Sequence, residues 1–207
     1  MHATLANAMK LAYLAVFLIA PILAQGPEEN IPTFGVSVVV PLGLTGQIYK
    51  LKPNDNDIPK FEKLKPIGTI YTQQLAIQPR AFSEGFPGVT DVFEWFAIDY
   101  TGFFWIEQEG EYHFFLTSDD GSRLYLDGKK VVDNDGIHPA EMKEGKIKLK
   151  RGKHFLHVQY FQGPRYHVAL ILEVMPPEGS RKIFSTLDFK PPPGFDDFSQ
   201  LGDPGKR

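Results

Sequence analysis

The sequence contains no cysteine. No disulfide can therefore hold the fold, and no cysteine can carry a lipid near the N-terminus. An excess of positive charge is also missing, because the net charge is −3, and this argues against a nucleic-acid binder. The apolar run at residues 11–20 is shorter than the roughly 20 residues of a membrane-spanning helix. No long helical pattern and no internal repeat is present.

The first 25 residues are typical of a signal peptide. Lys10 precedes the apolar run, and Pro21 ends it. We therefore expect a secreted protein, extracellular or periplasmic, without a membrane span once residues 1–25 are removed. Residues 26–42 are interpreted as a linker with a possible first strand, Val36–Val40.

Residues 43–175 are predicted to form one all-β domain. The chain holds 17 Phe, 8 Tyr, 19 Gly and 17 Pro, a mixture that favours strands and short loops over helices. Short strands at regular spacing indicate an antiparallel β-sandwich or barrel. The predicted strands are Gly43–Lys50, Thr69–Thr72, Phe93–Ala97, Tyr100–Glu107, 111–117, Ser122–Leu126, Lys129–Val132, Lys146–Lys150, Lys153–Gln162 and His167–Met175.

Two further expectations concern the end of the chain. The strands Lys153–Gln162 and His167–Met175 are expected to pair as a hairpin that turns at Gly163-Pro164. Residues 176–207 are predicted to be a Pro-rich tail partly docked on the domain, through the apolar side chains Phe184, Leu187 and Phe189.

Two adjacent aspartates, Asp119 and Asp120, are the first candidate for chemistry. Neighbouring carboxylates repel each other and tolerate burial poorly. Ca²⁺ binds six to eight oxygen ligands and accepts carboxylates together with carbonyl groups, so it would suit such a pair. The residues alone leave an alternative open, in which Ser118–Gly121 is a turn whose aspartates cap backbone amides.

The longest recognisable pattern runs from Tyr112 to Lys129, Tyr-His-Phe-Phe-Leu-Thr-Ser-Asp-Asp-Gly-Ser-Arg-Leu-Tyr-Leu-Asp-Gly-Lys. This segment resembles the central signature of the PA-14 domain, the module first described in anthrax protective antigen. Residues 43–49 resemble its opening strand, and residues 158–163 resemble its penultimate strand. The resemblance covers about residues 43–175 and implies a PA-14-like antiparallel β-sandwich or barrel exposed outside the cell.

The resemblance also implies a ligand. The best understood PA-14 domains are lectins in which two aspartates joined by a cis peptide bind Ca²⁺, and the ion ligates sugar hydroxyls. By this similarity Asp119 and Asp120 are expected metal ligands. Gln162 stands where those lectins carry Asn and is the third expected ligand. Arg165 and Tyr166, in the same loop, are expected to contact the sugar.

The function predicted from these features is a secreted, lectin-like module that binds a glycan or cell-surface polysaccharide, with Ca²⁺ as cofactor. The alternative is a structural or interaction module that binds envelope or matrix proteins. An enzyme is not expected, because no nucleophile motif is present. Two other features are noted: the acidic turn Asp133–Gly136, and the two tryptophans, Trp95 and Trp105, which are interpreted as core residues. If the protein were a glycoside hydrolase, the carboxylates that could supply its catalytic pair are Glu94, Asp99, Glu107 and Glu109.

Overall fold

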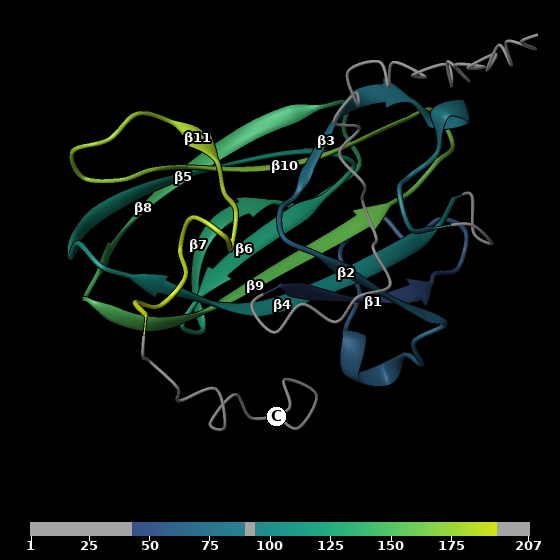
Figure 1. The fold of residues 1–207 in the computed structure, drawn as a ribbon. Helices are drawn as coiled ribbons and strands as arrows, with labels where there is room; N and C mark the ends of the chain where they lie inside the picture. The colour runs from purple at the N-terminus through teal and green to yellow at the C-terminus, as the bar shows by residue number, and fades with distance from the viewer. Residues whose placement is uncertain (1–42, 90–93, 194–207) are drawn as a thin grey trace, which may run out of the picture. The chain divides into compact units, whose positions relative to one another are not determined.

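The structure is a computed structural model that describes residues 43–89 and 94–193. The predicted signal peptide (1–25) and linker (26–42) lie outside the described residues, as does the end of the predicted tail. The described chain forms two antiparallel sheets packed face to face (Figure 1). The predicted antiparallel β-sandwich is therefore confirmed.

The larger sheet has six strands in the order β2-β1-β4-β9-β6-β7. Every neighbouring pair in this sheet is antiparallel. The bounds of the strands, in sequence order, are β1 Leu44–Lys50, β2 Gly68–Thr72, β4 Phe96–Ile106, β6 Ser122–Leu126, β7 Lys129–Asn134 and β9 Gly152–Gln162.

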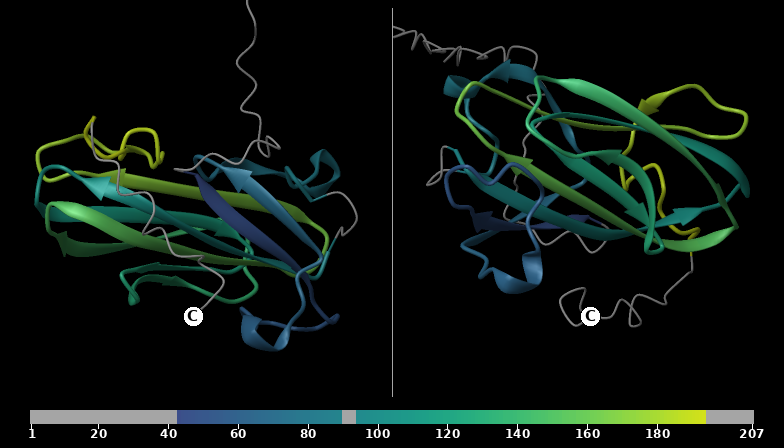
Figure 2. Two further views of the ribbon diagram at one scale, coloured as in Figure 1. Left: turned by 60° about the horizontal axis from the view of Figure 1, so that its bottom comes forward. Right: turned by 180° about the vertical axis from the view of Figure 1, so that it is seen from behind.

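The smaller sheet has five strands. Four follow the order β11-β10-β5-β8, and β3 also pairs with β10. The views in Figure 2 show this sheet stacked on the larger one. Its strands are β3 Ala76–Ala81, β5 Gly110–Asp119, β8 Glu141–Leu149, β10 His167–Met175 and β11 Lys182–Ile183. In the described chain the only helical segments are two short 3-10 turns, η1 Phe61–Lys63 and η2 Phe82–Glu84, and no helix there is long and apolar enough to span a bilayer.

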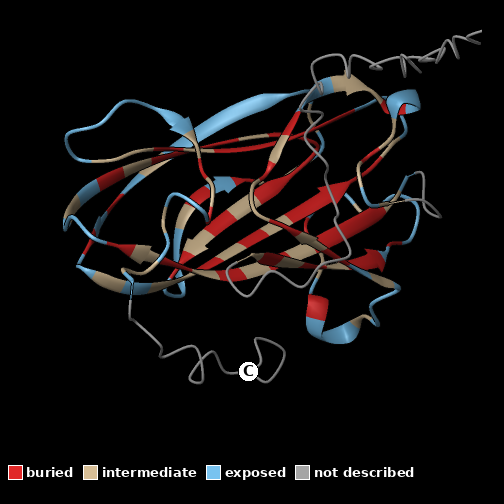
Figure 3. Cartoon of the chain, in the orientation of Figure 1, coloured by how far each residue is buried: buried red, intermediate tan, exposed pale blue. Residues whose placement is uncertain are grey.

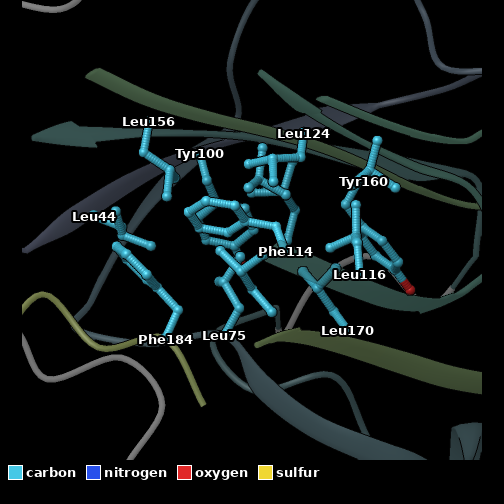
Figure 4. Packing of buried hydrophobic residues seen from close by; sticks show 14 of the residues in the cluster. Leu44, Leu75, Tyr100, Phe114, Leu116, Leu124, Leu156, Tyr160, Leu170 and Phe184 are labelled. Carbon is cyan, nitrogen blue, oxygen red and sulfur yellow. The ribbon is translucent and has the colours of Figure 1, made fainter. Parts of the chain in front are cut away.

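Alternation along the strands builds the core between the sheets. In β4, every second residue from Phe96 to Ile106 is buried, because successive strand side chains point to opposite faces. Figure 3 shows this alternation in β4 and β9, whereas β8 is largely exposed. Figure 4 shows side chains of both sheets meeting in the core, among them Tyr100, Leu124, Leu156, Phe114 and Leu170.

A second, smaller cluster covers part of the outer face of the six-stranded sheet. The loop after β1 folds back and places Ile58 and Phe61 against Phe161 of β9. Trp95, just before β4, packs against the same cluster and is only partly buried. The loop therefore supports one end of the sheet from outside.

Several details of the strands differ from the prediction, among them β8, which begins at Glu141 and not at Lys146, and the short β11, which was not predicted. The two strands expected at 93–97 and 100–107 are one continuous strand, β4. β3 was not predicted, because Pro79 lies within it; β3 pairs only with β10, and an edge strand tolerates a proline. The expected hairpin of β9 and β10 is wrong, since β9 pairs with β4 and β6 whereas β10 pairs with β3, β5 and β11.

The start of β1 and the docked part of the tail both contact the second half of β4. An added Cβ on Gly102 would lie 2.7 Å from the Leu44 side chain. In the tail, Phe184 is fully buried and its ring stacks on Phe189 at 5.2 Å. The carbonyl of Phe189 accepts the Trp105 amide at 2.7 Å. Leu187, which was also expected to dock, is 49% exposed.

Four connections cross from one sheet to the other at a single end of the sandwich. They are β3–β4, β5–β6, β7–β8 and β9–β10. Trp95 N–H donates to the Gly163 carbonyl at 3.1 Å and joins the β3–β4 and β9–β10 crossings, and Phe161 N–H of β9 donates to the Gly121 carbonyl of the β5–β6 crossing at 2.9 Å. We call this the crossing end.

The corner where β7 meets β8 depends on Gly145. A Cβ at this position would lie 2.0 Å from the backbone oxygen of Val131. Because backbone atoms have little room to move, we expect Gly145→Ala to lower the free energy of unfolding by about 2 kcal/mol or more. Urea titration followed by tryptophan fluorescence measures this loss.

Gly68→Ala is the matched control. Gly68 also lies in a strand, and its nearest contact for an added Cβ is Ile48 Cδ1 at an ordinary 3.4 Å. This variant should stay within about 0.5 kcal/mol of the parent protein. Equal unfolding midpoints for the two variants would contradict the close packing of β7 on β8.

Candidate functional site

The aspartate pair lies at the crossing end, where the chain passes from one sheet to the other. Asp119 is the last residue of β5, and β6 begins at Ser122, so Asp120 and Gly121 make the whole crossing. The peptide bond between the two aspartates is cis. Asp119 is 7% exposed and Asp120 is 4% exposed. Two adjacent carboxylates are therefore nearly buried in a very short connection.

Backbone amides of two other crossings hold the Asp120 carboxylate. Gly163 N–H donates to Oδ2 at 2.8 Å, and His138 N–H donates to Oδ1 at 3.2 Å. Gly163 belongs to the β9–β10 crossing and His138 to the β7–β8 crossing. One carboxylate thus links three crossings. Its hydrogen bonds to backbone amides are those expected of the alternative in which the aspartates cap a turn.

Gln162 lies next to the pair, but its amide is oriented differently from the expected ligand. Its Nε2 donates to Asp120 Oδ2 at 3.2 Å, to the Pro164 carbonyl at 3.1 Å and to the His167 carbonyl at 3.0 Å. Its Oε1 lies 2.6 Å from the Tyr160 hydroxyl. A flipped amide would set its oxygen against three acceptors. In this arrangement Gln162 positions Asp120 and does not present an oxygen to a cation.

Burial dominates the electrostatics of the two carboxyl groups. It raises the pKa of Asp120 to about 6, against the effect of the Gly163 and His138 amides, and the neighbouring charge of Asp119 adds to the rise. Burial also raises the pKa of Asp119, while His167, His138 and the Ala140 amide act in the opposite direction.

In the part of the chain that the structure describes, no lysine or arginine forms an ion pair with either aspartate, and the positive side chains that act on them are His138 and His167. Among the described residues, every ion pair involves other carboxylates than Asp119 and Asp120. Two buried carboxylates that form no ion pair with a lysine or arginine are a costly arrangement. A bound cation would remove that cost, so the donor chemistry of this pair fits Ca²⁺.

The remaining ligands of a calcium ion would have to be backbone oxygens, water or ligand hydroxyls. Within residues 43–89 and 94–193, no group of three or more histidine, aspartate or glutamate side chains gathers closely enough to hold a metal. Ca²⁺ accepts carbonyl and hydroxyl oxygens alongside carboxylates, so a two-carboxylate site suits this ion better than zinc.

Arg165 and Tyr166, the residues expected to contact the sugar, lie on the β9–β10 crossing at the rim of the site. Tyr166 is 75% exposed. The Arg165 guanidinium lies over the Phe82 ring, 5.8 Å from its centre. Phe82 N–H donates to the Tyr166 carbonyl at 3.0 Å, which fixes the loop backbone against η2.

Two apolar residues at the rim were not predicted from the sequence. Trp95 was interpreted as core, and Ile137 was not singled out. A Cβ on Gly163 would lie 3.3 Å from Asp120 Oδ2, 3.4 Å from Trp95 Cζ3 and 3.5 Å from Ile137 Cδ1. The indole, the isoleucine and the carboxylate therefore converge on one point. No sequence spacing indicates this, because the three residues come from three different crossings.

The acidic turn at Asp133–Gly136 serves the scaffold. Asp135 accepts the Ile58 amide at 2.9 Å and forms an ion pair with Arg123. It thereby anchors the loop after β1 to the β7–β8 crossing. The part of this crossing that reaches the aspartate pair is the His138 amide.

Two of the carboxylates considered for hydrolysis, Asp99 and Glu107, are far apart and are held in separate ion pairs. Asp99 in mid-β4 pairs with His157, and Glu107 just past β4 pairs with Arg151. At strand rise they are about 25 Å apart, whereas glycosidase carboxyl groups lie within about 10 Å of each other.

Solved structures with the same fold include two that are named PA14 domains. The "PA14 sugar-binding domain from RTX adhesin" has a TM-score of 0.57 and 20% identity, over 70% of this chain and 96% of that one. The A domain of epithelial adhesin 9 from Candida glabrata, solved with a galactosyl-GlcNAc ligand, has a TM-score of 0.51 and 13% identity, over 77% of this chain and 94% of that one.

An "anti-sigma factor domain-containing protein" also shares the fold, with a TM-score of 0.57 and 21% identity over 73% of this chain. The present chain spans only 49% of that protein. A comparison with curated proteins found no significant match. The family model described as "PA14 domain" matches residues 74–186, which is more than half of the 207 residues. The chain belongs to the PA14 domain family.

Proposed function

We propose that this protein is a secreted glycan-binding module in which Asp119 and Asp120 hold a calcium ion. The observation that supports it most directly is the pair of nearly buried carboxylates, which form no ion pair with a lysine or arginine of the described residues. Related folds named as sugar-binding and adhesin domains support the same proposal. The proposed partners are a glycan or cell-surface polysaccharide outside the cell.

The chain's own residues would prepare this site before any ligand arrives. The Gly163 and His138 amides orient the Asp120 carboxylate, and Gln162 keeps the β9–β10 crossing in place. Arg165 and Tyr166 offer a guanidinium and an exposed phenol at the rim. When bound, calcium would supply positive charge and open coordination positions for sugar hydroxyls.

The proposal predicts that calcium and sugar binding depend on the same carboxylates. Calcium should bind below millimolar concentration and raise the melting temperature, because it neutralises the buried pair. Asp119→Asn should abolish both effects and all binding on a glycan array. Calorimetry with CaCl₂ and a calcium-containing array measure these outcomes, and Asp133→Asn is the control that should retain both.

A wild-type protein that does not bind calcium would rule out the metal site. An array without hits, together with a stable protein complex in a pulldown, would instead favour the alternative of a structural or protein-interaction module.

Gln162 provides a test of positioning against metal ligation. Gln162→Leu removes three hydrogen bonds of Nε2 and one of Oε1. We expect it to lower the free energy of unfolding by about 2 to 4 kcal/mol, and to a similar extent in EDTA and in calcium. Thermal melts in both buffers provide the comparison. A loss confined to the calcium buffer would mean that Gln162 is a ligand.

Without metal, the aspartate pair should make stability depend on pH. The pKa of Asp120 is about 6 in the folded protein and near 3.8 when unfolded, so the folded state retains its proton longer. The free energy of unfolding in EDTA should therefore fall, by at most about 3 kcal/mol, as pH rises from 4 to 6. Asp120→Asn should remove this decline, which urea titration at each pH would detect. A parallel decline in this variant would contradict the assignment.

A further inference from the structure

The indole of Trp95 lies next to the aspartate pair and has no part in the proposed calcium site. The Trp95 ring and the Ile137 side chain come within van der Waals distance of the same point as Asp120 Oδ2, at Gly163. Any larger side chain at Gly163 would fill that point. The indole and the isoleucine therefore lie next to the Asp120 carboxylate, and together we call them the wall.

The backbone holds Trp95 firmly in this place. Its φ is +53°, a conformation that is uncommon for a residue other than glycine. Its N–H donates to the Gly163 carbonyl at 3.1 Å, and its carbonyl accepts the Leu51 amide at 2.7 Å. Such a conformation persists only where the surroundings support it, and it is often found at binding sites.

The side chains at the rim remain partly open to solvent. Trp95 is partly buried against the outer cluster, and Ile137 is 44% exposed. Together they form an apolar surface beside an anionic, hydrogen-bonding centre. Because a planar indole packs well on an apolar face, this combination suits a ligand with hydroxyls on one edge and C–H groups on its face.

We propose that Trp95, with Ile137, is the residue that makes the site select cyclic pyranose sugars over acyclic polyols. This inference rests on the proposed glycan-binding function. The wall contacts the C–H face of the sugar ring while the ring hydroxyls engage the Asp119–Asp120 centre. An acyclic polyol carries the same vicinal hydroxyls but presents no rigid apolar face, so it gains little from the wall.

The chain offers a direct readout because it has only two tryptophans. Trp105 lies at the far end of β4, about 30 Å along the strand from the crossing end. In a Trp105→Phe variant, all tryptophan emission comes from Trp95. With calcium present, titration with methyl β-D-glucopyranoside or methyl β-D-galactopyranoside should produce a saturable change in this emission. Sorbitol should bind at least about tenfold more weakly.

Substitutions separate the wall from the metal. Trp95→Ala should weaken pyranoside binding at least about tenfold and remove the preference over sorbitol, while calorimetry with CaCl₂ alone stays unchanged. Trp95→Phe, which keeps a planar ring, should retain part of the preference. Trp105→Ala is the matched control and should bind as the parent does. Melting temperatures of each variant in EDTA report whether the fold is intact.

The outcomes distinguish this inference from the function on which it rests. Calcium-dependent pyranoside binding that leaves Trp95 emission and the Trp95→Ala affinity unchanged would overturn the wall and leave the glycan site standing. If neither calcium nor any of the pyranosides binds the parent protein, both proposals fail. Calcium binding that survives Trp95→Ala together with a lost sugar preference supports the inference.

Discussion

The acceptance of two backbone N–H groups by the Asp120 carboxylate organises one whole end of this domain. The donors, Gly163 and His138, belong to two different sheet crossings, and Asp120 itself lies on a third. A neutral side chain of the same shape would have only one acceptor for these two amides. The carboxylate therefore holds the crossings together, and the crossings in turn keep the carboxylate away from water.

This arrangement combines two opposed demands. Burial raises the pKa of Asp120 and so disfavours its charged form, while the amides from neighbouring loops favour it. Gln162 adds a third donor, and the Tyr160 hydroxyl holds the oxygen of that amide. The pair is thus held by hydrogen bonds while its burial disfavours its negative charge.

Several strands of the larger sheet could be predicted from alternation, because β4 and β6 bury every second side chain. The predictions failed where alternation carries no information. Because Pro79 lies within it, β3 was not predicted. The turn between β9 and β10 did not show that these strands belong to different sheets. Gly163-Pro164 has the composition of a hairpin, but the chain there changes sheets. Pairing across sheets depends on long-range contacts that a local pattern does not contain.

The site could be predicted only in part, because its residues meet through long-range contacts. The two aspartates are adjacent in the sequence and could be recognised there. The resemblance to the PA-14 domain predicted the loop of Gln162 beside them. The direction of the Gln162 amide could not be predicted, since it is set by the carbonyls of Pro164 and His167. Trp95 and Ile137 meet Asp120 only because separate crossings converge, and an aromatic before a strand is ordinarily core.

The places where the chain joins the sandwich lie away from the crossing end. Leu44 lies beside Gly102, about 20 Å along β4 from Phe96, and Phe189 is hydrogen-bonded to Trp105 farther on. The aspartate pair therefore lies at the opposite end of β4 from the contacts of Leu44 and Phe189.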